Sequence, residues 1–214
     1  MSDTVTLADI EAAAGRLDGV VRRLPVHSAR WLSDRVGGPV FLATENLQRA
    51  GSFKIRGAYN RLSQLSDAER AAGVVAASAG NHAQGVALAA SMLGIRSTIF
   101  MSRSASMPKV TATRDYGAEV IFHGATLDEA IVEARAFAES TGAIFISPFD
   151  HADIVAGQGT LGLEILEQVP DARTVVVCTG GGGLLAGVAL AIKSQRPDIT
   201  VIGAQAAGAA AYPP

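Results

Sequence analysis

Lys54 is the residue whose chemistry distinguishes this chain, and it lies in the run Ser52-Phe53-Lys54-Ile55-Arg56-Gly57. Only three of the 18 Lys and Arg residues are lysines, so arginine supplies most of the positive charge. Arginine stays protonated, whereas a desolvated lysine can become a neutral amine and form an imine with a carbonyl group. The apolar neighbours Phe53 and Ile55 favour the neutral form. Lys54 is therefore a candidate for Schiff-base chemistry; a lysine that simply extends from a loop is the alternative.

Four consecutive glycines form a second candidate site, the tetraglycine loop Gly180-Gly181-Gly182-Gly183, which is followed by Leu184. The loop joins an apolar segment, typical of a buried strand, to a predicted helix. Glycines let backbone N–H groups crowd around an anion, and a helix N-terminus adds partial positive charge. The loop therefore predicts a phosphate site, and a glycine-rich turn without a ligand is the alternative.

Two other phosphate-binding patterns also contain a glycine-rich loop before a helix. A Walker A loop needs Lys and then Ser or Thr after its last glycine, but Leu184 and Leu185 stand there. The dinucleotide pattern G-x-G-x-x-A is present, but it also needs an acidic residue about 20 residues further on, at the end of the next strand. That strand is followed by Gln205, which argues against a dinucleotide.

A third candidate site, the turn Ser78-Ala79-Gly80-Asn81-His82, consists of small and polar residues between a predicted strand and a predicted helix. Its backbone amides and the hydroxyl group could hold a carboxylate. A fourth, Gly157-Gln158-Gly159-Thr160, is interpreted as a turn before a helix, with Thr160 either an N-cap or a ligand contact. The four histidines and Cys178 show no metal-ligand spacing, so no metal is predicted.

The remaining pattern alternates apolar strands with amphipathic helices, which predicts an α/β fold with mostly parallel sheets. The predicted strands are residues 40–42, 74–77, 97–101, 119–122, 143–147, 174–178 and 200–204, and the main predicted helices are residues 57–65, 81–93, 108–116, about 126 onward, 160–168 and up to 194.

Composition narrows the classes of function. The chain has 214 residues, 49% of them hydrophobic, and a net charge of −2, which does not suggest a nucleic-acid-binding protein. It contains no run of about 18 apolar residues that would span a membrane, and we expect no signal peptide. A single cysteine excludes an internal disulfide. We therefore expect a cytoplasmic protein.

An imine-forming lysine, a phosphate site and a carboxylate site together suggest pyridoxal phosphate and an amino-acid substrate. At this point the chain resembles the threonine dehydratases, fold-type II pyridoxal-phosphate enzymes related to serine racemase. The resemblance runs from about Leu24 to the C-terminus, and five motifs in the same order carry it: Glu45-Asn46-Leu47-Gln48, residues 52–60, residues 78–85, residues 156–160 and residues 180–184.

The resemblance implies a role for each matching residue. Lys54 would carry the cofactor as an imine and, once freed by the substrate amine, would remove the Cα proton. Phe53 would pack beside the cofactor, and Asn81 would bind the ring hydroxyl. The tetraglycine loop and Leu184 would bind the cofactor phosphate, and the substrate carboxylate would be bound by Ser78, Ala79, Gly80, Asn81 and His82.

The implied architecture is two three-layer α/β domains, as in the β subunit of tryptophan synthase. Residues 49–148 would form the small domain, and residues 1–48 and 149–214 an incomplete large domain. Family members continue beyond the position of Pro214, and the group that contacts the pyridine nitrogen comes from that part. We therefore expect a C-terminally truncated chain with a hydrophobic edge at its last strand, and a homo-oligomer for the full-length form.

The implied reaction is deamination of L-threonine to 2-oxobutanoate and ammonia, and of L-serine to pyruvate. Serine racemase and 3-hydroxyaspartate dehydratase remain alternatives, but Ala79 lies where the racemase has a proton-donating serine. The stretch of residues 205–211, where the racemase binds its metal, contains no carboxylate. A non-catalytic fragment that binds phosphate ligands or a full-length partner is the other open alternative, and a dinucleotide-binding module is a weaker one.

Overall fold

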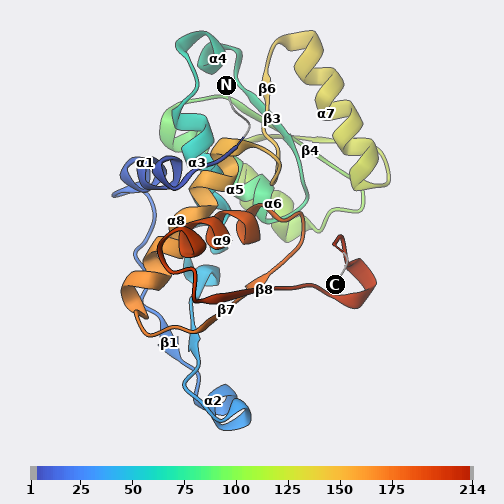
Figure 1. The fold of residues 1–214 in the computed structure, drawn as a ribbon. Helices are drawn as coiled ribbons and strands as arrows, with labels where there is room; N and C mark the ends of the chain where they lie inside the picture. The colour runs from blue at the N-terminus through green and yellow to red at the C-terminus, as the bar shows by residue number, and fades with distance from the viewer. Residues whose placement is uncertain (1–3, 213–214) are drawn as a thin grey trace.

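The computed structural model describes residues 4–212 and contains two groups of parallel strands with helices packed around them (Figure 1). This confirms the predicted α/β fold with parallel sheets. In Figure 1 the helices α8 (Ala152–Gln168) and α9 (Gly183–Gln195) lie between the larger sheet and the pair of strands β7 and β8. A third, antiparallel pair, β1 (His27–Ser28) and β2 (Phe41–Leu42), stands apart from both.

The larger sheet has four parallel strands in the order β5-β4-β3-β6. Its members are β3 (Val74–Ala77), β4 (Ser97–Met101), β5 (Glu119–Phe122) and β6 (Ile144–Phe145). They are connected in chain order by α5 (Asn81–Leu93), α6 (Met107–Asp115) and α7 (Leu127–Thr141). Every residue of β3 and β4 is buried, as expected for central strands covered on both faces.

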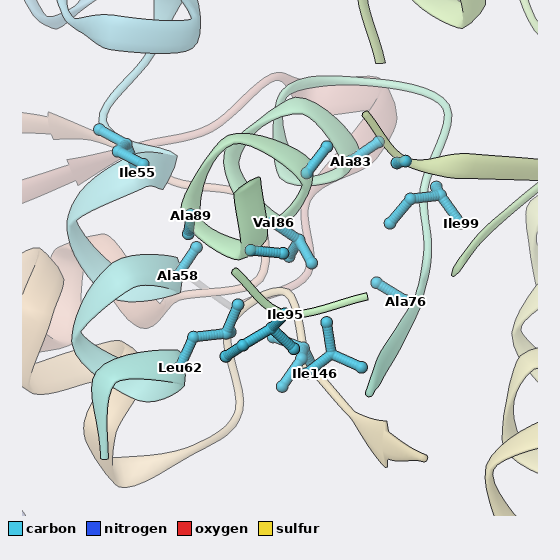
Figure 2. Packing of buried hydrophobic residues seen from close by; sticks show 14 of the residues in the cluster. Ile55, Ala58, Leu62, Ala76, Ala83, Val86, Ala89, Ile95, Ile99 and Ile146 are labelled. Carbon is cyan, nitrogen blue, oxygen red and sulfur yellow. The ribbon is translucent and has the colours of Figure 1, made fainter. Parts of the chain in front are cut away.

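Helices cover both faces of this sheet and give it three layers. On one face, α7 packs Ala130 and Ala134 against Val75 and Phe100 of the sheet. On the other face, α3 (Lys54–Ser63), α5 and α6 enclose the largest apolar cluster, part of which is shown in Figure 2. Ile55, at the start of α3, belongs to this cluster, so the segment that carries Lys54 is anchored to the core.

The second group consists of β7 (Thr174–Cys178) and β8 (Thr200–Ala204), which pair in parallel. Among the described residues, α9 covers one face of this pair, and α8 and α1 (Leu7–Leu17) pack behind it. The other face exposes Val176 and Ile202, which are register partners. This exposed surface is a face of the strand pair, and the hydrophobic edge expected at the last strand stays a prediction.

Glycines bring α3, α8 and α9 unusually close together. A Cβ added to Gly157 of α8 would lie 2.6 Å from the carbonyl oxygen of Arg56 in α3. A Cβ added to Gly187 of α9 would lie 2.6 Å from the backbone nitrogen of Gly159 in α8. The prediction of a turn at residues 157–160 is therefore wrong: these residues lie inside α8, and the glycines serve helix packing. Thr160 is not an N-cap, because α8 begins at Ala152.

Several shorter elements complete the fold. They are α2 (Arg30–Val36), which lies at the end of the arm formed by β1 and β2 in Figure 1, α4 (Asp67–Ala72), and the 3₁₀ turns Glu45–Leu47, Arg49–Gly51 and Ala207–Ala209. Neither α2 nor α4 was predicted, and α3 begins at Lys54 rather than at Gly57.

The larger sheet falls within residues 49–148 and the pair β7–β8 within residues 149–214. The domain boundaries themselves stay a prediction.

Candidate active site

A cleft of about 390 Å³ lies where the N-terminus of α3 meets the carboxyl ends of β7 and β8. This is the usual place for a ligand in an open parallel sheet, and the volume is within the range of small-molecule sites. Its lining brings together Lys54, Phe53, the whole tetraglycine loop and Leu184, and also includes Pro148, Phe149, Gln158, residues 178–179, Leu185 and residues 204–206. The structure therefore places the imine candidate and the phosphate candidate in one cleft.

Lys54 is the first residue of α3, and its side chain reaches across the cleft. Its Nζ donates a hydrogen bond to the carbonyl oxygen of Pro148 at 2.6 Å and lies 5.3 Å from the centre of the Phe53 ring. Burial lowers the pKa of Lys54 from 10.5 to about 8. Since no carboxylate is paired with this amine in the described part of the chain, the neutral form is within reach near neutral pH.

The tetraglycine loop has the backbone of an anion site. Gly182 has a φ of 89°, in the left-handed region, and α9 begins at Gly183 directly after it. A Cβ on Gly181 would overlap the ring of Phe149, and a Cβ on Gly183 would lie 2.7 Å from the carbonyl oxygen of Phe149. A Cβ on Gly180 would meet nothing within 4 Å, so this residue faces open space. At positions 181–183 only glycine fits, and the absence of side chains there leaves room for a ligand to approach the backbone N–H groups at the start of α9.

The turn of residues 78–82 lies at the carboxyl end of β3, and α5 begins at Asn81. The backbone nitrogen of Gly80 donates to the Ser78 hydroxyl at 3.1 Å. Asn81 is exposed, and none of these five residues lines the cleft described above. One helical turn further on, α5 touches the lysine segment, because a Cβ on Gly85 would lie 3.0 Å from the Cβ of Lys54. The assignment of the turn to the substrate carboxylate stays a prediction.

His82 is buried beneath this turn rather than exposed to a ligand. Its Nε2 lies 3.0 Å from the carbonyl oxygen of Ile146, which fixes Nε2–H as the donor. Burial, together with the nearby charge of Lys54, lowers the pKa of His82 to about 4. The ring is therefore neutral at pH 7, and any contact from His82 to a carboxylate would have to come from its backbone.

The family was identified by comparison with known proteins. A family model described as pyridoxal-phosphate dependent enzyme matches residues 17–213. The chain belongs to the pyridoxal-phosphate dependent enzymes.

Several similar curated relatives of this pyridoxal-phosphate enzyme are named for one activity. The chain is 54% identical over 201 residues to the L-threonine ammonia-lyase of Thermotoga maritima, and this alignment covers 94% of this chain and 50% of the relative. It is 50% identical over 201 residues to the catabolic L-threonine dehydratase TdcB of Escherichia coli K12, and that alignment covers 94% of this chain and 61% of the relative. The chain thus spans about half to three fifths of the length of these relatives.

Solved structures give the same fold. A serine racemase from maize superposes with a TM-score of 0.91 at 40% identity, covering 94% of this chain and 61% of that one. The processed form of threonine deaminase isoform 2 from Solanum lycopersicum gives a TM-score of 0.91 at 43% identity, with coverage of 95% and 59%. Family membership decides against the dinucleotide-binding module.

The cleft of this pyridoxal-phosphate enzyme fits its cofactor on structural grounds alone. The cofactor carries an aldehyde, an aromatic ring and a phosphate. Lys54 offers a partly desolvated amine for the aldehyde, Phe53 offers a ring surface, and the tetraglycine loop offers N–H groups for the phosphate.

Within residues 4–212, no group of three or more His, Cys, Asp or Glu side chains could hold a metal ion. No helix in the same range is long and apolar enough to cross a membrane.

Arg56 is a central residue that the sequence interpretation missed. Its fully buried guanidinium binds the Glu45 carboxylate with Nε and Nη2 at 2.8 and 2.9 Å. It binds the Glu164 carboxylate with Nη1 and Nη2 at 2.6 and 2.9 Å, and donates to the Thr160 hydroxyl at 3.1 Å. Burial acts to lower the pKa of Arg56, but hydrogen bonds and charges from Glu45 and Glu164 outweigh it and raise the pKa. The network joins α3, two residues after Lys54, to α8.

Proposed function

We propose that this chain provides the lysine and the phosphate site of an L-threonine ammonia-lyase, which converts L-threonine to 2-oxobutanoate and ammonia and also deaminates L-serine to pyruvate. The observation that carries the proposal is the placement of Lys54, with its lowered pKa, and of the tetraglycine loop in one cleft. The names of the relatives at 50% identity and above support threonine as the substrate.

The chemistry of the chain's own residues follows from their positions. Pyridoxal phosphate, when bound, condenses with an amino group and withdraws electrons from the bonds at the adjacent carbon. Lys54 Nζ would hold the cofactor through its aldehyde group, and its neutral amine would be the base that accepts the Cα proton, for which a pKa of about 8 is suitable. Phe53 would pack beside the ring, and Asn81 would bind the ring hydroxyl.

The remaining assignments concern anionic groups. The tetraglycine loop and Leu184 hold the cofactor phosphate with backbone N–H groups at the start of α9. Residues 78–82 are assigned to the substrate carboxylate through their backbone, since the side chain of His82 is buried. Three further assignments stay predictions: the cytoplasmic location, the homo-oligomer, and the division into a small domain (residues 49–148) and a large domain (residues 1–48 and 149–214).

The proposal is tested by identifying the lysine that binds the cofactor. The protein is incubated with pyridoxal phosphate and reduced with borohydride, and the labelled peptide is identified by mass spectrometry. We expect the label on Lys54, with Lys109 and Lys193 unlabelled. Lys109→Ala and Lys193→Ala are the matched controls, and both should still be labelled at Lys54. A label on either of the other lysines, with Lys54 unmodified, would overturn the assignment.

Racemisation is the competing activity, supported by the similarity to serine racemase structures. It requires a proton donor on the substrate face opposite Lys54, and the methyl group of Ala79 cannot supply one. We therefore propose elimination rather than racemisation. Incubation with L-serine should give pyruvate without a comparable rate of D-serine formation, and EDTA should not change the rate. D-Serine appearing as fast as pyruvate would favour the racemase.

A further inference from the structure

Tyr212 contacts the tetraglycine loop without lining the cleft. Its hydroxyl group donates a hydrogen bond to the carbonyl oxygen of Gly181 at 2.9 Å. A Cβ on Gly182 would overlap the same hydroxyl group. Tyr212 is absent from the cleft lining and instead borders a neighbouring hollow together with Phe149, Asp150 and residues 181–183 of the loop. The tyrosine therefore touches the loop without occupying the space of the ligand.

Gln205 holds Tyr212 in this position. The Oε1 of Gln205 accepts hydrogen bonds from the backbone nitrogens of Ala211 at 3.0 Å and Tyr212 at 3.2 Å. The Nε2 of Gln205 donates to the backbone carbonyl oxygen of Tyr212. One side chain thus binds the Tyr212 backbone at both its donor and its acceptor. Gln205 follows β8 directly, so the tyrosine is tied to the end of the sheet pair.

The hydrogen bond to Gly181 fixes the orientation of the next peptide group. A trans peptide is planar, so its carbonyl oxygen and its N–H point in opposite directions. When the Gly181 carbonyl is held toward Tyr212, the N–H of Gly182 must point away from Tyr212, and Gly182 itself lines the cleft. Four consecutive glycines can rotate their peptide groups at low cost, so an external restraint is needed to keep this orientation.

We propose that Tyr212 is a positioning residue that orients the Gly182 N–H toward the phosphate group bound in the cleft. The inference rests on the proposed cofactor site. It gives residues after β8, which lie outside the tetraglycine loop, a role in phosphate binding. The hydroxyl group acts through the loop and does not touch the ligand.

The test compares three ligands on the parent chain and on Tyr212→Phe, which keeps the ring and removes only the hydroxyl group. Binding of pyridoxal phosphate and of pyridoxal, which lacks the phosphate, is measured by calorimetry. Inorganic phosphate is titrated while the Gly182 amide resonance is followed by NMR. We expect Tyr212→Phe to weaken pyridoxal phosphate and inorganic phosphate about fivefold, the usual effect of losing one hydrogen bond, and to leave pyridoxal binding unchanged. The control is Tyr116→Phe, a tyrosine of the α6 C-terminus, which should change none of the three.

Each other outcome decides a separate point. Unchanged phosphate binding would overturn the positioning role. Equal losses of affinity for all three ligands would overturn it as well, because they would indicate general damage to the cleft. The two proposals can also separate. If Tyr212→Phe loses phosphate affinity but Lys54 of the parent chain reacts with neither pyridoxal phosphate nor pyridoxal, the inference stands and the proposed function is refuted. A parent chain that binds no phosphate in any form would refute both.

A second pair of variants tests the restraint itself. Gln205→Leu removes all three hydrogen bonds to residues 211–212 and should weaken inorganic phosphate to a similar extent. If Gln205 acts through Tyr212, the double variant should lose no more affinity than either single variant. Additive losses would contradict the proposed connection.

Discussion

Lys54 and Pro148, 94 positions apart in the chain, are joined by a 2.6 Å hydrogen bond from the lysine Nζ to the proline carbonyl oxygen. When the amine is neutral, donating one N–H to this carbonyl turns its lone pair away from Pro148. Two residues earlier, the carbonyl oxygen of Ile146 accepts from the neutral ring of His82. The segment of residues 146–148 therefore accepts hydrogen bonds from both the Lys54 and the His82 side chains through its backbone carbonyl groups.

The lowered pKa of Lys54 predicts a specific pH dependence of its reactivity. Only the neutral amine is nucleophilic, so with a pKa of about 8 the reactive fraction falls about tenfold per pH unit below 8 and becomes nearly complete about one unit above it. The rate at which trinitrobenzenesulfonate modifies Lys54, followed by peptide mass spectrometry, should rise between pH 6 and pH 8 and level off near pH 9. A Lys54→Ala chain gives the background from the other amines. A rate that still rises tenfold between pH 9 and pH 10 would contradict the lowered pKa.

The same pKa predicts that Lys54 destabilises the folded chain at neutral pH. The unfolded chain binds the proton with a pKa of about 10.5 and the folded chain with a pKa of about 8, so the free energy of unfolding should rise as the pH increases between these values. Below pH 8 the full cost is present. Lys54→Met should therefore raise the free energy of unfolding at pH 7 by roughly 1–3 kcal/mol while it abolishes imine formation. Urea unfolding at pH 7 and pH 10 measures this, and the gain should be smaller at pH 10.

Arg56→Lys should be strongly destabilising despite the conserved charge. The guanidinium binds both carboxylates with two N–H groups each, and an ammonium group cannot reproduce this geometry. Leaving buried carboxylate oxygens without partners costs roughly 3–5 kcal/mol of the free energy of unfolding. Since α3 carries Lys54, the affinity for pyridoxal phosphate should also fall.

The matched control for Arg56→Lys is Arg23→Lys. Arg23 pairs with Glu167 at the surface, where the two side chains are 64% and 61% exposed. Solvent screens such a pair, so the substitution should have no measurable effect on unfolding. Equal losses in the two variants would show that the buried network contributes nothing specific.

Much of the fold could be predicted from local patterns, because the strands of the larger sheet are short apolar runs between amphipathic helices. Lys54 and the tetraglycine loop were likewise visible, since each combines an unusual residue choice with a position next to a predicted element. The helix α4 was missed although Ser66 and Glu69 form a capping box that could have indicated it. The helix α2 has no side-chain cap and no buried residue, so its sequence carried little signal.

The errors at the site arose where tertiary packing decided the outcome. Residues 157–160 have the composition of a turn, but their glycines allow α8 to approach α3 and α9. Arg56 finds its partners 11 and 108 positions away, and no local pattern reports such a pairing. The neighbours of His82 likewise come from a distant segment, so its burial could not be read from its own turn.

Gly157→Ala tests the close approach of α8 and α3. The added methyl group would lie 2.6 Å from the Arg56 carbonyl oxygen and 2.7 Å from the Gly57 Cα, so the helices must separate. We expect a loss of about 1–3 kcal/mol in the free energy of unfolding. The control is Gly15→Ala in α1, where nothing lies within 4 Å of the new Cβ. That variant should gain up to about 1 kcal/mol from helix propensity, so a gain in both would contradict the packing argument.

The apolar face of β7 and β8 predicts self-association. Val176 and Ile202 are register partners with exposed fractions of 63% and 46%, so they form a continuous apolar surface on strands that have no cover on that side within the described residues. Adjacent exposed apolar side chains favour association, whereas single ones do not. The double variant Val176→Thr and Ile202→Thr should therefore reduce the weight-average mass measured by sedimentation at high protein concentration and change the free energy of unfolding by less than about 0.5 kcal/mol. Val132→Thr, at a valine of α7 that is 69% exposed, is the control and should change neither quantity. If the double variant associates as strongly as the parent chain, the interface lies elsewhere and this face is not its cause.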